Sequence, residues 1–166
     1  MEVYVIDDKA EELENARIAI EAAGHECANG ELSAIQMFNA GIGKEHGNRG
    51  QLAQVELLTA VERMRDCGGG IITDMMFNLI PQNGDVPPSG ILVVLHALSR
   101  GVPLVVCTDA EEVGGHHAKA LSWIHDAYIM PARRCGVLPF GWIETKNWKN
   151  AVKKLEDIQV KKGEGK

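Results

Sequence analysis

Three short apolar stretches of this sequence are each followed by residues that could take part in phosphoryl chemistry. These residues are Asp7 and Asp8, Asp74, and Thr108. Three carboxylates brought close together repel one another, and at neutral pH they need a bound cation or a raised pKa. An all-oxygen site with open positions suits Mg²⁺, which keeps water ligands and takes phosphate oxygens. With the Thr108 hydroxyl and the Lys146 ammonium alongside, the group would form a phosphoryl-binding site in which Asp74 is the nucleophile.

These residues meet only if the apolar stretches are neighbouring strands of one parallel sheet. Residues 70–73 form a glycine-bounded, β-branched run, which predicts a strand buried on both faces. Residues 3–6 and 102–107 have the same character. In a doubly wound sheet the first and third strands are neighbours, and ligands bind beyond their carboxyl ends. We therefore expect the carboxylates of Asp7, Asp8 and Asp74 to converge.

Helical and strand patterns alternate along the rest of the chain. Apolar residues recur at helical spacing in 9–23, 31–40, 51–67, 90–99, 116–126 and the segment that begins near Trp148. Residues 25–28 are a weak second strand, and the fifth strand is either 127–130 or 137–143. We favour 137–143, because a helix begins soon after it. The pattern predicts a doubly wound five-stranded parallel sheet with a helical insertion after the second strand.

Composition limits the class of protein. The 166 residues fit a single domain over 1–160, followed by a charged tail at 161–166 that we expect to be disordered. Acidic residues outnumber basic ones 23 to 17, which argues against a nucleic-acid-binding surface. No leader pattern is present, and no apolar run approaches the roughly 20 residues needed to span a membrane. The four cysteines form no CxxC pair, so we expect reduced thiols and a cytoplasmic protein.

In this set of residues the chain resembles the receiver domain of response regulators. The matching positions are Val5–Asp8, Asp74 with Met76 nearby, Gly90–Leu92, Pro103–Thr108 and Lys146. The resemblance covers most of the chain, and the acidic pair, the central Asp, the Thr and the Lys are specific only as a set. It implies a flavodoxin-like (CheY-like) strand order of 2-1-3-4-5.

The resemblance also implies a role for each residue of the set. Asp74 would accept a phosphoryl group from a histidine kinase or a phosphotransfer protein. Asp7 and Asp8 would hold Mg²⁺ together with Asp74 and the backbone carbonyl of Met76. Thr108 and Lys146 would contact the phosphoryl oxygens. Because no output domain follows, the phosphorylated form would act on a separate, unknown protein partner.

Several positions depart from the family's pattern. The first proline after the phosphoacceptor is Pro81, which comes later than in the family. The acidic Asp109 replaces a small residue, and Asn147 replaces a proline. Ile143 lies where an aromatic switch residue is expected, with Trp142 on the opposite face of the strand. The segments 31–67 and 111–136 are also longer than their counterparts in the family. These departures favour an alternative hypothesis, a degenerate receiver that is never phosphorylated and acts as a protein-interaction module. A small Mg²⁺-dependent phosphohydrolase is a third hypothesis.

Each candidate residue also has a purely structural interpretation. Asp7, Asp8 and Thr108 could cap the helices that follow them. Asp74 could begin an ordinary loop, and Lys146 could be a surface lysine at a helix start. The Gly114–His117 sequence could suggest a metal site, but adjacent histidines point in different directions on a helix, so an exposed loop is the simpler interpretation.

Overall fold

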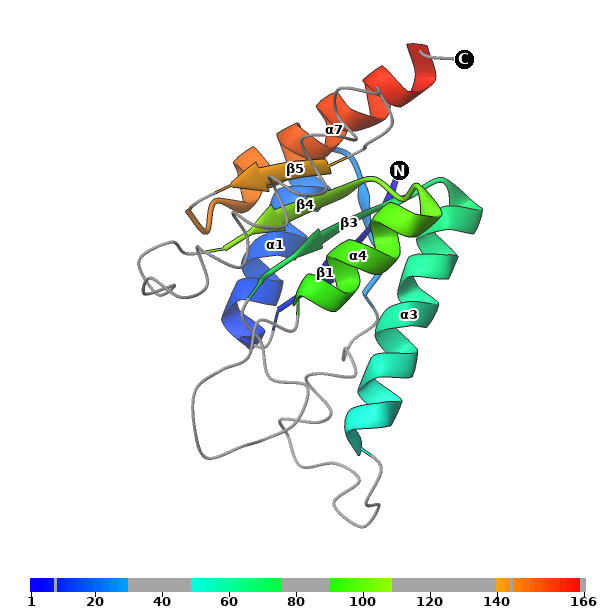
Figure 1. Ribbon diagram of the computed structural model, residues 1–166. Coiled ribbons are helices and arrows are strands. Elements are labelled where there is room, and N and C mark those ends of the chain that lie inside the picture. The colour runs from blue at the N-terminus through cyan, green and yellow to red at the C-terminus, as the bar shows by residue number, and fades with distance from the viewer. Residues whose placement is uncertain (8, 30–48, 76–89, 109–139, 144, 165–166) are drawn as a thin grey trace.

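The computed structural model describes residues 1–7, 9–29, 49–75, 90–108, 140–143 and 145–164. Its centre is a parallel sheet of five strands (Figure 1). The strands are β1 (Glu2–Ile6), β2 (Glu26–Cys27), β3 (Gly70–Thr73), β4 (Leu104–Cys107) and β5 (Phe140–Ile143). They lie side by side in the order β2-β1-β3-β4-β5, and every neighbouring pair is parallel. The predicted doubly wound α/β fold with strand order 2-1-3-4-5 is confirmed.

Helices cover both faces of this sheet. They are α1 (Ala10–Ala22), α3 (Arg49–Cys67), α4 (Gly90–Arg100) and α7 (Trp148–Glu164). Figure 1 shows α3 and α4 in front of the sheet and α1 and α7 behind it. Two separate apolar clusters correspond to this division, one beneath each pair of helices. The sheet is therefore buried on both sides, as the uninterrupted apolar strands of the sequence predict.

Side chains that alternate along each strand contribute to both apolar clusters. In β1, Tyr4 and Ile6 pack beneath α3 and α4, whereas Val3 and Val5 pack beneath α1 and α7. Successive side chains of a strand point to opposite faces of a sheet, so a strand between two helical layers must be apolar at every position. The β3 residues Gly70–Thr73 are all buried for the same reason.

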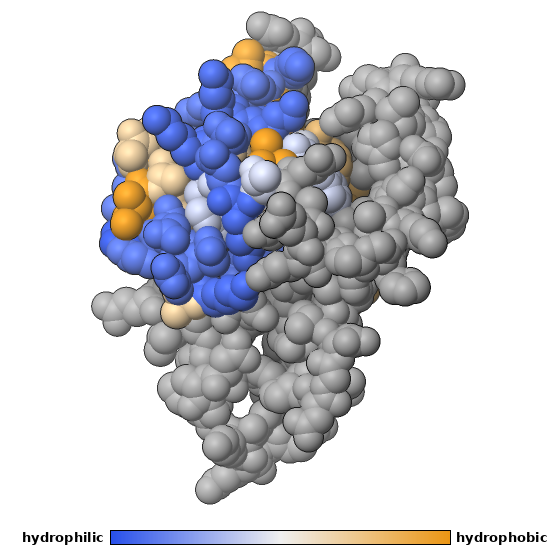
Figure 2. All heavy atoms as spheres, turned by 90° about the vertical axis from the view of Figure 1, so that its left-hand side faces the viewer, coloured by the Kyte–Doolittle hydropathy of each residue, from blue (hydrophilic) through white to orange (hydrophobic). Residues whose placement is uncertain are grey.

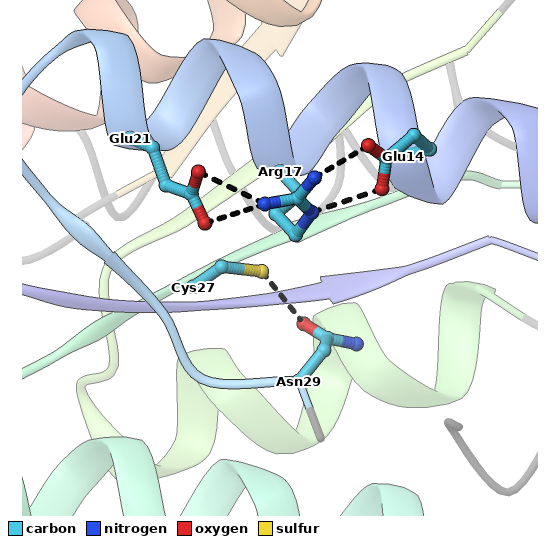
Figure 3. A network of polar contacts seen from close by, with 5 residues as sticks. All are labelled: Glu14, Arg17, Glu21, Cys27 and Asn29. Atoms are coloured by element: carbon cyan, nitrogen blue, oxygen red, sulfur yellow. Dashed lines mark hydrogen bonds and ion pairs between the residues drawn. The ribbon is translucent and has the colours of Figure 1, made fainter. Parts of the chain in front are cut away.

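A side chain extends the pairing at the β2 edge of the sheet. The two-residue β2 strand ends at Cys27, but the carboxamide of Asn29 continues the ladder. The Val5 amide donates to Asn29 Oδ1 over 2.6 Å, and Asn29 Nδ2 donates to the Val5 carbonyl over 2.6 Å. Figure 3 shows Asn29 beside the Cys27 thiol, below the exposed pairs that Arg17 makes with Glu14 and Glu21. The weak second strand of the sequence is thus stabilised by an amide side chain.

Several boundaries differ from the sequence expectations. The fourth strand begins at Leu104 because Pro103 has no N–H, although the Pro103 carbonyl still accepts from the Ile71 amide over 2.9 Å. The fifth strand, Phe140–Ile143, falls within the favoured 137–143. The tail from Lys161 is expected to be disordered, but its first part is helical, since α7 continues through Glu164. The expected helices at 31–40 and 116–126, and the alternative strand at 127–130, lie outside the described residues.

The described surface on the side shown in Figure 2 is mostly hydrophilic, with apolar atoms in small, separated spots. Within the ranges given above, no helix combines the length and apolar character that crossing a bilayer requires. The three cysteines in those ranges carry free thiols, of which Cys107 is buried and Cys67 is exposed.

Candidate functional site

The register of β1 and β3 places two aspartates side by side. Ile6 pairs with Thr73, so the next residues, Asp7 and Asp74, leave the carboxyl ends of adjacent strands together. The Asp74 amide still donates to the Ile6 carbonyl over 2.8 Å, which extends the pairing to the site itself. Both aspartates are buried, Asp7 completely. The predicted convergence of these two carboxylates is therefore observed.

Each aspartate turns one oxygen toward a nearby backbone amide. Asp7 Oδ1 accepts from the Lys9 amide over 2.8 Å, and Asp74 Oδ1 accepts from the Met75 amide over 2.6 Å. The Asp7 contact is the local turn in which an aspartate bonds to the backbone two residues ahead. The residue at the N-cap of α1 is Lys9, which makes no side-chain capping bond. These amides fix the carboxylate orientations and leave Oδ2 of each aspartate toward the shared space.

Lys146 occupies that shared space. Its Nζ lies 2.8 Å from Asp7 Oδ2 and 2.9 Å from Asp74 Oδ2, and its side chain is only 9% exposed. The backbone after it is fixed by Asn147, whose Oδ1 accepts from the Asn150 amide over 3.0 Å and so caps α7. Asn147, at a position where receivers have proline, thus caps α7, the helix that follows the site. Lys146 is not a surface lysine.

Burial and neighbouring charges shift the pKa values of Asp7 and Lys146 in opposite directions. Burial raises the pKa of Asp7 from 3.8 to about 6, although the hydrogen bond and charge of Lys146 and the Lys9 amide favour the ionised form. Burial by itself would lower the pKa of Lys146, but its pairs with Asp7 and Asp74 outweigh burial and raise it above its ordinary value. Lys146 is therefore a permanent cation, while Asp7 carries a carboxylate whose ionisation costs free energy.

Thr108 lies at the same edge of the sheet, one strand away from Asp74. It follows β4, is 2% exposed, and its amide donates to the Ile143 carbonyl over 3.2 Å. The preceding thiol of Cys107 donates to the Thr145 carbonyl over 3.8 Å, and burial raises the pKa of that thiol to about 12. The structure thus brings Asp7, Asp74 and Lys146 into contact and places Thr108 at the neighbouring strand end.

Other expected site residues lie outside the described ranges, namely Asp8, Met76, Asp109 and the Gly114–His117 sequence. Among the residues that are described, no group of three or more His, Cys, Asp and Glu side chains is arranged to hold a metal ion. The described part of the site is therefore a carboxylate pair bridged by an ammonium.

The predicted geometry of the last strand is also observed. Ile143 packs toward the α1 and α7 side of the sheet, and Trp142 packs toward the α3 and α4 side. The residue in the expected position of the aromatic switch is thus aliphatic, and the neighbouring tryptophan belongs to the other layer.

Two features near the site do not follow from the sequence expectations. Gly90 begins α4 so close to β3 that a Cβ there would clash with the Asp74 carbonyl oxygen. Trp148 is buried and donates from Nε1 to Glu12 Oε2 over 2.7 Å. The glycine at the start of an apolar helix is the available signal for the first feature. No local pattern indicates the second, because 136 residues separate its partners.

The fold and site define a doubly wound parallel α/β protein with an Asp–Lys–Asp cluster at the carboxyl edge of its sheet. The chain matches no protein-family model and no curated protein. Among solved structures it is similar to the CMP N-glycosidase BcmB of Clostridium botulinum, with 14% identity and a TM-score of 0.47 over 94% of this chain and 98% of that chain. Similarity at this level identifies neither a family nor an activity.

Proposed function

We propose that this protein is a receiver-like phosphoacceptor in which Asp74 takes a phosphoryl group and the modified form binds a different partner. The observation that carries the proposal is the contact of Lys146 with both Asp7 and Asp74. These three residues come from distant parts of the chain and meet at the sheet edge where α/β proteins bind ligands. Packing alone does not require three buried charged groups at one place.

The chemistry follows from the two oxygens of Asp74. A carboxylate oxygen attacks the phosphorus of the donor, and the electron pair of the breaking P–O or P–N bond leaves with the donor's carboxylate oxygen or imidazole nitrogen. The product is an acyl phosphate on Asp74. The Met75 amide orients the carboxylate, and Lys146 supplies a fixed positive charge beside the oxygens that gain negative charge. Thr108, which follows the neighbouring strand β4, would contact the phosphoryl oxygens through its hydroxyl.

A divalent cation fits the donor chemistry of the site. Two buried carboxylates and one ammonium carry a net negative charge, and the raised pKa of Asp7 indicates that its ionised form is under-compensated. Asp7 and Asp74 would hold Mg²⁺, with Asp8 and the Met76 carbonyl added on the basis of the family resemblance. When bound, Mg²⁺ would neutralise charge on the phosphoryl oxygens.

The biological setting follows from the same proposal. The donor would be a histidine kinase or a phosphotransfer protein, and the output would be a change in binding to another protein, in the cytoplasm. Phosphorylation adds charge at Asp74 and changes the partner of Lys146, so the segment between β5 and α7 is where the change begins. Neither a nucleic acid nor a membrane is part of this function.

Intact-mass analysis after incubation with acetyl phosphate and Mg²⁺ tests the proposal. We expect the mass to increase by one phosphoryl group, the adduct to be removed by hydroxylamine, and both effects to disappear in Asp74→Asn. Asp66→Asn is the matched control, because Asp66 is an exposed carboxylate on α3. A folded wild-type protein that gains no adduct would contradict the proposal and favour the interaction-module hypothesis. Continuous release of phosphate without a lasting adduct would favour a phosphohydrolase.

A further inference from the structure

A groove of about 430 Å³ lies between α3 and α4, the two helices that Figure 1 shows next to each other in front of the sheet. Its lining is apolar apart from His96 and Ser99. Three of its leucines are open to solvent, with 41% of Leu58, 48% of Leu92 and 42% of Leu95 exposed. Leu92 and Leu95 are three residues apart on α4 and so share one face of that helix.

The groove holds most of the exposed large apolar side chains in the described ranges. The only others are Ile18 on α1 and Val160 on α7, the two helices on the opposite face of the sheet. Single apolar residues scattered over a surface are ordinary, whereas a group of them in one groove is typical of an interaction site.

One end of the groove has a polar rim. Glu62 of α3 places its Oε1 2.7 Å from Arg100 Nε and 3.2 Å from His96 Nε2, so these pairs join α3 to the last turn of α4. The other oxygen of Glu62 pairs with Arg65. Arg100 is 47% exposed, and no residue in the described ranges accepts from its two terminal nitrogens. Arg100 is thus held at Nε and keeps donors for an anion at the rim.

The shape and size of the groove limit what can fill it. Small-molecule sites enclose most of their ligand, whereas leucines exposed by more than 40% form an open trough. A stable interface between two globular proteins takes about 800 Å² from each partner, but the three leucines together expose little more than the area of one whole leucine side chain. A single helix fits this trough, because its side chains can pack along the line between two neighbouring helices.

We propose that the groove between α3 and α4 is a docking site for one amphipathic helix of a partner protein. An apolar stripe on that helix, with residues three or four positions apart, would cover Leu58, Leu92 and Leu95. An acidic side chain beside the stripe would pair with Arg100 and fix the direction in which the helix lies. Docking requires no phosphoryl group on Asp74, so this inference does not depend on the proposed function.

Phage display of helical 15-residue peptides against the whole protein tests the docking site. We expect the selected peptides to share an apolar stripe flanked by an acidic residue. Fluorescence anisotropy then gives the affinity of the tightest peptide. Leu95→Gln should weaken its binding by about tenfold, because the peptide no longer covers the exposed part of a leucine. Ile18→Gln is the matched control, an exposed apolar residue on α1, and should bind as wild type does. Leu92→Gln provides a second variant if Leu95→Gln does not fold.

A second measurement tests the pairing with Arg100. Replacing the acidic residue of the selected peptide by its amide should weaken binding to wild type by about two- to fivefold, the range of an exposed ion pair. The same replacement should have no effect on binding to Arg100→Gln, because the partner charge is gone. Arg63→Gln is the matched control, since Arg63 is an exposed arginine of α3 that pairs with Glu2, and it should keep the full effect.

The remaining outcomes would overturn the inference. Selection may yield no peptide that prefers wild type to Leu95→Gln, and the groove is then not a helix-docking site. Selected peptides that lack an acidic residue, or whose acidic residue is not coupled to Arg100, would show that the pairing is wrong. Sedimentation equilibrium of the protein alone tests the other occupant. A dimer that Leu95→Gln dissociates and Ile18→Gln does not would assign the groove to a second copy of this chain.

Discussion

The indole of Trp148 donates a 2.7 Å hydrogen bond to Glu12 and so joins the first turn of α7 to the first turn of α1. These two helices begin directly after the two sides of the candidate site, since Lys146 precedes one and Asp7 precedes the other. The indole is 5% exposed, so the bond is made largely out of water. This hydrogen bond therefore links the helix that follows Asp7 to the helix that follows Lys146.

Loss of the hydrogen bond between Trp148 and Glu12 should destabilise the protein measurably. We expect Trp148→Phe to lower the free energy of unfolding by about 1 to 3 kcal/mol, because a hydrogen bond to a charged group and some buried area are both removed. Glu12→Gln should cost less than Trp148→Phe, since an amide oxygen can still accept. Urea denaturation of the two single variants and the double variant gives the coupling energy. Strictly additive effects would show that the two residues contribute independently.

Asp7 should make the metal-free protein less stable as the pH rises. Its pKa is about 6 in the folded protein against 3.8 ordinarily, so the folded state binds more protons between these values. The stabilisation is complete below about pH 4 and is lost as the pH rises through about 6. Asp7→Asn removes the ionisable group and leaves Lys146 paired with Asp74. In EDTA at neutral pH, we expect this variant to be more stable than wild type by about 1 to 3 kcal/mol.

Denaturation in EDTA across this pH range provides the measurement. The difference between wild type and Asp7→Asn should shrink as the pH falls below 6, and the exposed-site control Asp66→Asn should show no such trend. An Asp7→Asn protein that is less stable than wild type at neutral pH would mean that the ion pair with Lys146 outweighs the cost of burying the carboxylate.

Gly90 tests how closely α4 must approach the site. An alanine Cβ there would clash with the Asp74 carbonyl oxygen and lie 2.8 Å from Met75 Cα, and both are backbone atoms that cannot rotate away. We expect Gly90→Ala to destabilise the protein by about 1 to 3 kcal/mol, the usual cost of overpacking. It should also displace Asp74 and slow its phosphorylation.

Gly101 provides the contrasting substitution at the other end of the same helix. Its φ is +66°, but no neighbouring atom lies within 4 Å of the position that an added Cβ would take, so alanine there meets strain and no clash. We expect Gly101→Ala to cost about 1 to 2 kcal/mol and to leave Asp74 phosphorylation unchanged. Equal effects of the two substitutions on phosphorylation would show that α4 does not position Asp74.

The sheet and the carboxylate pair can be predicted from the sequence because their signals are local. Buried parallel strands are short apolar runs, and the strand order with the register of β1 and β3 makes Asp7 and Asp74 neighbours. The position of Lys146 is harder to predict, since it depends on where the fifth strand ends and on the cap that Asn147 provides for α7.

Other features depend on contacts that no local pattern encodes. The Trp148–Glu12 bond joins opposite ends of the chain, and the sharing of Lys146 between two oxygens depends on side-chain geometry. The sequence underestimates the length of α7 because its last turns are charged and contain Gly163, which is typical of a frayed tail. Here the continuing helix overrides the low propensity of that glycine.

The carboxamide of Asn29 offers a test of the sheet edge nearest Asp7. It accepts from the amide of Val5 and donates to the carbonyl of Val5, two residues before the site. Asn29→Asp keeps the shape and the acceptor but places a second oxygen against the Val5 carbonyl. We expect a loss of about 2 to 3 kcal/mol at neutral pH, because the donor is replaced by a repulsive carboxylate. A protonated aspartate regains a donor, so the loss should shrink at acidic pH. Urea denaturation of Asn29→Asp and Asn29→Ala across this pH range measures the effect. A loss of unfolding free energy in Asn29→Asp that does not change with pH would show that the Val5 carbonyl finds another donor.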